Sequence, residues 1–146
     1  MIRDNRGYTT TEFLFYFALF IFMIFGVVDY WLTMKKVDQV DHLKEYNLTR
    51  AKLEGYLSIA DENNLISKLT SANYTEIQIT ASAKESNGDP RILRNVNDVS
   101  ANEIDLRIRC TPNPKPFLFG MLVGSPNPND VYFDMEGSAL VERVDP

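Results

Sequence analysis

The chain has 146 residues but only one cysteine and one histidine, Cys110 and His42. A single cysteine excludes an intrachain disulfide and cannot build a thiolate zinc site. His42 shares a helical face with Asp38 and Glu45, an arrangement common on solvated helices. The sequence also lacks a glycine-rich phosphate loop, a nucleophile elbow and zinc-ligand spacing. We therefore expect no catalytic residues, no metal, no cofactor, no small-molecule substrate and no enzymatic activity.

Proline is absent from the first 89 residues, since Pro90 is the first of the seven in the chain. Proline breaks helices because it lacks an N–H and clashes with the preceding turn. One helix can therefore run from about residue 10 to residue 57, a length of about 70 Å. Its second half carries an interrupted apolar stripe that predicts packing on a head domain. The stripe consists of Val37, Val40, Leu43, Leu48, Ala51 and Leu57.

Basic clusters are scarce as well. The net charge is −5, and the sequence has no basic cluster beyond the pair Lys35-Lys36. This composition gives no electrostatic surface for nucleic acid. Cys110 falls in a stretch of alternating apolar residues, so we expect it to be a buried small apolar side chain. An intermolecular disulfide is the alternative role for this residue.

One long apolar run stands out from this polar background. Residues 13–28 carry no charge, and Tyr30, Trp31 and Leu32 extend the run beyond Asp29. The 20 residues 13–32 match the length needed to cross a bilayer core of about 30 Å. A buried core helix is the alternative, but the remaining chain is too small to enclose it. We expect a single-pass span in the cytoplasmic membrane.

The residues that flank the span predict its orientation. Arg3 and Arg6 precede it, which favours a cytoplasmic N-terminus and an extracytoplasmic head. Tyr30 and Trp31 fit the aromatic belt at the outer interface. A cleaved secretory signal peptide is the alternative. No small-x-small cleavage site follows the apolar run, so we expect the span to remain in the mature protein.

The junction before the span carries the functional signal. Residues 6–13 read Arg-Gly-Tyr-Thr-Thr-Thr-Glu-Phe, so a glycine precedes an aromatic residue and a glutamate stands at the edge of the apolar run. This pattern resembles the type III signal of type IV pilins, although their residues between aromatic and glutamate are mostly apolar. The resemblance implies that a prepilin peptidase cuts between Gly7 and Tyr8. A glycine suits such a site because its backbone extends readily into a protease cleft.

A second pattern, in the later part of the span, makes the resemblance more specific. Residues 25–30 read Phe-Gly-Val-Val-Asp-Tyr, which resembles the corresponding segment of TadE-like pseudopilins from tight-adherence (Flp) pilus loci. The two patterns together cover residues 6–30, and beyond them the resemblance is one of architecture. It implies assembly through Glu12 and Phe13, with Glu12 facing the new N-terminal amine of a neighbouring subunit. The alternative is that Glu12 is an interfacial carboxylate that interacts favourably with the helix dipole.

The rest of the chain predicts an α+β head of pilin-like type. Residues 61–64 are expected to form a loop and residues 65–69 a short helix. Alternating apolar residues predict strands at 74–83, 104–110 and 132–144, the last with a bulge at Gly137. Their one-sided apolar patterns favour a small antiparallel three-stranded sheet packed on the long N-terminal helix. Residues 117–123 are apolar without periodicity, and could pack on the sheet, lie on the membrane or contact a partner.

These observations divide the chain into a cytoplasmic leader at 1–7, a transmembrane assembly helix at 8–32 and a head at 33–146. The first hypothesis is a minor pilin or pseudopilin, a structural protein of a type IV-related pilus or secretion pseudopilus. Its partners would be other pilin subunits and the pilus assembly machinery. The second is an uncleaved single-span accessory subunit of an envelope or conjugation machine, whose head binds a partner protein. A membrane-tethered enzyme ranks last.

Overall fold

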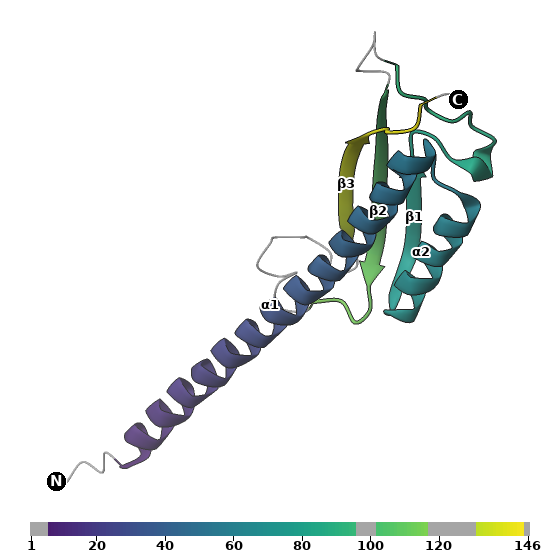
Figure 1. The fold of residues 1–146 in the computed structure, drawn as a ribbon. Coiled ribbons are helices and arrows are strands. Elements are labelled where there is room, and N and C mark those ends of the chain that lie inside the picture. The colour runs from purple at the N-terminus through teal and green to yellow at the C-terminus, as the bar shows by residue number, and fades with distance from the viewer. Residues whose placement is uncertain (1–5, 96–101, 117–130, 145–146) are drawn as a thin grey trace, which may run out of the picture.

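The structure, a computed structural model, describes residues 6–95, 102–116 and 131–144. One long helix projects from a small head in which the same helix and a shorter one cover a sheet (Figure 1). The elements follow the order α1 (Arg6–Glu54), α2 (Ile59–Ser71), β1 (Tyr74–Ala81), η1 (Glu85–Asn87), β2 (Glu103–Pro112) and β3 (Phe133–Leu140). This arrangement confirms the predicted α+β fold, with a long N-terminal helix on a three-stranded antiparallel sheet.

Helix α1 ends at Glu54, three residues before the predicted end at residue 57. Gly55 has φ +80°, a left-handed conformation that terminates the helix at little cost because glycine has no Cβ. The following Leu57 is buried as predicted, but it lies outside the helix and forms a bridge to Lys84.

The prediction of a loop at residues 61–64 is wrong, because these residues belong to α2. Ser58 is the N-cap, and its hydroxyl accepts a hydrogen bond from the Asp61 N–H at 3.1 Å. The Asp61 carboxylate is buried, yet it pairs with Arg50 of α1 at 2.8 Å. Two acidic side chains in the first turn, Asp61 and Glu62, also suit the positive end of the helix dipole.

The sheet is a meander with order β1-β2-β3, so β2 is its central strand. The predicted bulge at Gly137 is wrong, because the register of β2 with β3 is regular from Glu103↔Leu140 to Cys110↔Phe133. Gly137 instead permits a close approach of α1. A Cβ at this position would lie 3.2 Å from a side-chain carbon of Leu48 and 3.2 Å from one of Lys44.

The irregularity of the sheet lies in β1, where the register shifts between Thr75 and Gln78. Glu76 has φ +52° at this point. An extra residue in one strand changes which side chains face the core. Tyr74 therefore points inward and is 2% exposed, although strict alternation along 74–83 would put it on the same side as Glu76 and Gln78.

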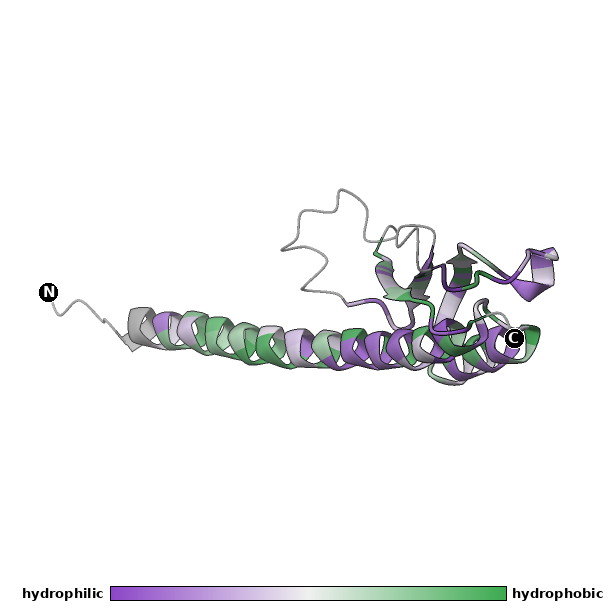
Figure 2. Cartoon of the chain, turned by 45° about the horizontal axis from the view of Figure 1, so that its top comes forward, coloured by the Kyte–Doolittle hydropathy of each residue, from purple (hydrophilic) through white to green (hydrophobic). Residues whose placement is uncertain are grey.

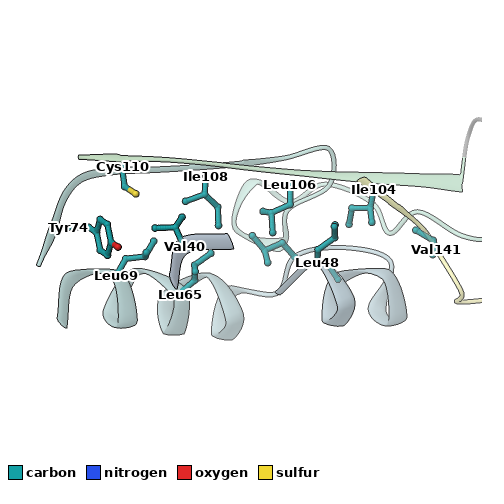
Figure 3. Packing of buried hydrophobic residues seen from close by; sticks show 12 residues of the cluster. Val40, Leu48, Leu65, Leu69, Tyr74, Ile104, Leu106, Ile108, Cys110 and Val141 are labelled. Carbon is teal, nitrogen blue, oxygen red and sulfur yellow. The ribbon is translucent and has the colours of Figure 1, made fainter. Parts of the chain in front are cut away.

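The core lies between the inner face of the sheet and the two helices (Figure 3). Central strand β2 contributes every second residue to it, from Ile104 to Cys110. The helices contribute Val40, Leu48 and Ala51 from α1 and Leu65 and Leu69 from α2. The predicted strands are otherwise confirmed, with ends that differ by at most four residues, and residues 117–123 lie outside the described residues.

Candidate assembly helix and its outer boundary

The first half of α1 projects from the head and is apolar on all sides. Figure 2 shows this half as a mostly hydrophobic rod that turns hydrophilic where the head begins. Helix Thr10–Glu54 contains an 18-residue window with a mean hydropathy of 2.2, and none of that window is buried within the molecule. The helix is therefore long and apolar enough to span a membrane. A surface of this size exposed on every side requires lipid or other helices around it.

The predicted assembly residues lie at the N-terminal edge of this rod. Glu12 and Phe13 are exposed, and the Phe13 ring stacks on Phe17 with centroids 6.1 Å apart. Phe17 follows Phe13 by four residues, so both rings lie on one face of the helix. The backbone of Gly7 and Tyr8 lies in the first turn of α1. A protease that cuts between them would have to unwind this turn, and terminal turns are where helices fray.

The predicted interface residues mark the other end of the rod. Tyr30 and Trp31 are exposed, and the ammonium of Lys35 lies 5.7 Å from the centre of the Trp31 ring. Thr33, 4% exposed, is the first buried residue of α1 in the described part of the chain. Its hydroxyl donates a 2.8 Å hydrogen bond to the Asp29 carbonyl. The change from exposed to covered helix therefore falls within one turn of the predicted membrane boundary.

Two hydrogen bonds attach the head to α1 close to this boundary, on its C-terminal side. The Tyr74 hydroxyl donates to the Lys36 carbonyl at 2.8 Å, and the Lys36 ammonium donates to the Pro114 carbonyl at 3.2 Å. Partial burial lowers the pKa of Lys36, because the charged form loses solvation. Burial also raises the pKa of Tyr74 to about 12. No linker separates the apolar half of α1 from the head, since the helix runs unbroken through both.

Pro114, Lys115 and Pro116 approach α1 from the segment that follows β2. They line a cleft together with Asp29, Leu32, Thr33, Lys36 and Phe133. The sequence predicted a proline-rich loop at 111–116 but not this contact with the helix. The signal that could have suggested it is the pair Lys35-Lys36, which ends the apolar half of α1 and so marks where the head begins.

Of the residues considered for chemistry, His42 and Asp38 line one groove, and Cys110 lies in the core. His42 lies on the wall of a groove between α1 and the C-terminal end of α2, beside Lys35 and Lys68. Within the described residues, no three His, Cys, Asp or Glu side chains are placed to hold a metal ion. Cys110 is buried as predicted, and desolvation raises its pKa to about 11. Its thiol is therefore protonated and unreactive near neutral pH.

Comparisons of the chain with protein-family models, curated proteins and solved structures found no match.

Proposed function

We propose that this chain is a pilin-like structural subunit, a minor pilin or pseudopilin, that assembles through the exposed half of α1. One observation carries the proposal. A single unbroken helix is apolar on every side over its first half and packs on a three-stranded antiparallel sheet over its second. An apolar rod fixed to a folded head can exchange lipid contacts for contacts with identical rods. The head then remains outside, on the surface of the assembly.

The N-terminal edge suggests how neighbouring subunits set their register. Cleavage between Gly7 and Tyr8 by a prepilin peptidase would add water across the peptide bond and leave a free amine on Tyr8. Glu12 follows Tyr8 by four residues, a rise of about 6 Å along the helix. A neighbour shifted by about one turn would bring its amine level with this carboxylate. The pair would neutralise both charges where neither can be solvated by water.

The resulting topology has the N-terminus in the cytoplasm and the head outside the cytoplasmic membrane. Arg3 and Arg6 on one side of the span, and an aromatic pair followed by a folded head on the other, support this orientation. The size of the head favours a minor subunit, because major Flp-type pilins are short and mostly helical.

The role of Glu12 can be tested in cells that carry the pilus machinery. Glu12→Gln should leave membrane levels and head folding unchanged, because Glu12 is exposed and distant from the head. Recovery of the variant with the machinery should fall, since the amine of the neighbour loses its counter-charge. Asp38→Asn, on the head-proximal part of the same helix, is the matched control. Equal recovery of the Glu12 variant and wild type would remove the assembly role assigned to this carboxylate.

An uncleaved accessory subunit is the second candidate, and the helical backbone at the cleavage position favours it. Intact mass in cells with and without the prepilin peptidase separates the two. A chain that begins at Tyr8 only when the peptidase is present supports the pilin-like subunit. A full-length chain in both strains supports the accessory subunit.

A further inference from the structure

Residues 113–116, which connect to the C-terminal end of β2, form a structure that we term the foot. In Figure 1 the chain leaves β2 at the end of the sheet nearest the projecting helix and returns towards α1. Pro114 accepts a hydrogen bond from Lys36, and the Asn113 N–H donates to the Asn73 carbonyl at 2.8 Å. These bonds attach the foot to α1 and to the residue before β1. Its position relative to the helix is therefore fixed by the fold.

The position of the foot relative to a membrane follows from the length of the apolar run. If residues 13–32 fill the hydrocarbon core, Lys35 and Lys36 stand about 5 to 6 Å beyond its edge. The headgroup layer of each leaflet extends about 5 to 8 Å beyond the core. Everything that contacts α1 at the level of Lys36 must therefore lie within the headgroup layer. The foot makes such a contact.

The chemistry of this surface suits phospholipid headgroups. Lys36 and Lys115 line the cleft beside the foot, in which Asp29 is the single carboxylate. Lys35 precedes Lys36 on α1 at the same height, and lines the neighbouring groove. A lysine ammonium has three donors, so the bond from Lys36 to Pro114 leaves it able to contact phosphate as well. Leu32 and Phe133 give the cleft apolar walls. The lysine ammonium groups would face the phosphate of a lipid, and the apolar walls of the cleft would face its acyl chains.

We propose that the foot and the three lysines bind lipid phosphates and hold the head against the outer surface of the membrane. This inference rests on the proposed membrane insertion of α1 but not on cleavage or pilus assembly. A subunit that enters an assembly would have to release these phosphate contacts as its helix leaves the lipid. The proposed partner of the foot and the three lysines is thus the membrane, which they contact before assembly, and not a second protein.

The test places a probe on the foot of the full-length chain in vesicles. Asn113→Cys carries a fluorophore that is quenched by lipids with a nitroxide on the headgroup. Asn87→Cys is the matched control, because η1 lies at the far end of the head. The Glu85 N–H donates to the carbonyl of Leu57 at 3.0 Å, three residues after Glu54, and Glu54 lies about 27 Å beyond Lys36 along α1. The unsubstituted chain should not be labelled, since Cys110 is buried. Trp31, the single tryptophan, reports insertion of the span in every sample.

We expect quenching at position 113 to exceed that at position 87 several-fold, and to increase when anionic lipid is added to zwitterionic vesicles. Lys35→Gln, Lys36→Gln and Lys115→Gln combined should reduce it while Trp31 stays quenched. Salt at about 1 M, where the Debye length is about 3 Å, should have the same effect without any substitution.

The result that overturns the foot proposal is equal quenching at positions 113 and 87 while Trp31 is quenched. The head would then stand away from the lipid although the span is inserted. If quenching at position 113 does not change with the lysine substitutions or with salt, the proposed binding of lipid phosphates by the lysines is wrong. Loss of Trp31 quenching in the unsubstituted chain would instead contradict the membrane insertion on which the proposed function depends.

Discussion

Gly55 shows how one residue joins two segments of the head, the end of α1 and the segment that contains Ile92. It ends α1 with φ +80°, and its carbonyl accepts a 2.8 Å hydrogen bond from the Ile92 N–H. A Cβ on Gly55 would lie 2.3 Å from the Ile92 carbonyl oxygen. Backbone conformation and lack of space therefore both disfavour every other residue at this position.

Gly88 offers a matched comparison, because its φ is +75° but a Cβ there would meet no atom within 4 Å. Gly88→Ala should lower the free energy of unfolding by about 1 kcal/mol, the cost of a left-handed alanine. Gly55→Ala should lower it by about 3 kcal/mol or more, since the clash displaces residues 91–95 as well. Chemical denaturation of both variants in detergent measures the difference. Similar losses would show that Ile92 moves aside at little cost.

Cys110 is a core residue whose ionisation couples to stability. Burial raises the pKa of its thiol to about 11 from an unfolded value near 9. A raised folded-state pKa means that the folded state favours the protonated thiol. The contribution to stability is therefore complete below about pH 9 and is lost as the pH rises through about 11.

The corresponding test compares wild type with Cys110→Ala across alkaline pH. The advantage of wild type in free energy of unfolding should be constant below about pH 8 and should shrink by about 2 kcal/mol towards pH 11. Tyr74 is present in both chains, and burial, the larger cause of its raised pKa of about 12, is common to them, while the Cys110 thiolate is the smaller cause. A pH-independent difference between the two chains would show that the thiol is solvated after all.

At the scale of elements, α1 changes character at Thr33 without interrupting its hydrogen bonding. Its packing face includes two polar residues, Lys44 and Asn47, that the apolar stripe omitted. Lys44 lies against Gly137, and its ammonium donates to Asp41 at 2.7 Å and to the Glu136 carbonyl at 3.4 Å. Hydrogen bonding by Asp41 raises the pKa of Lys44 and keeps it charged. The aliphatic stem packs while the charged end keeps its partners.

Helix α2 depends on its first turn, where Ser58 accepts from the Asp61 N–H and donates to the Asp61 carboxylate at 2.9 Å. Ser58→Ala should lower the free energy of unfolding by about 1 kcal/mol, the usual cost of losing a serine N-cap. Ser71→Ala at the other end of α2 is the control, because its exposed hydroxyl bonds only within the helix. Thermal melts of the two variants and wild type provide the comparison. A loss of equal size in both would assign the effect to α2 in general rather than to the cap.

At the scale of the whole molecule, the head has a core of its own. Buried residues from α1, α2, β1 and β2 meet in one cluster, and partly buried residues of β3 pack against it. The apolar half of α1 takes no part in this cluster. A fragment of residues 35–146 should therefore be soluble and monomeric. Its circular dichroism should show mixed α and β structure, and gel filtration should give the monomer size. Aggregation would indicate that residues 117–123 form an exposed apolar interface.

The sequence by itself determined the long helix, its apolar half and the sheet. These features follow from local patterns: an uncharged run of membrane length, no proline before Pro90, and alternation in the strands. The boundary near Trp31 and Lys35 was also readable, because charge and hydropathy change there within a few residues. Local patterns carry this information because they show which face of a strand, or which segment of a helix, is apolar and avoids water.

Only the tertiary structure decided where polar groups are buried and where the head meets the apolar half of α1. Asp61 was assigned to a loop because nothing nearby in the sequence reveals Arg50 as its partner. The inward direction of the Tyr74 side chain depends on the irregular register of β1 with β2. The position of the foot depends on the hydrogen bond from Lys36 to the Pro114 carbonyl, 78 residues away in the sequence. A buried charge or a displaced register is stable only when distant residues compensate it, and such compensation has no periodicity that a sequence pattern can carry.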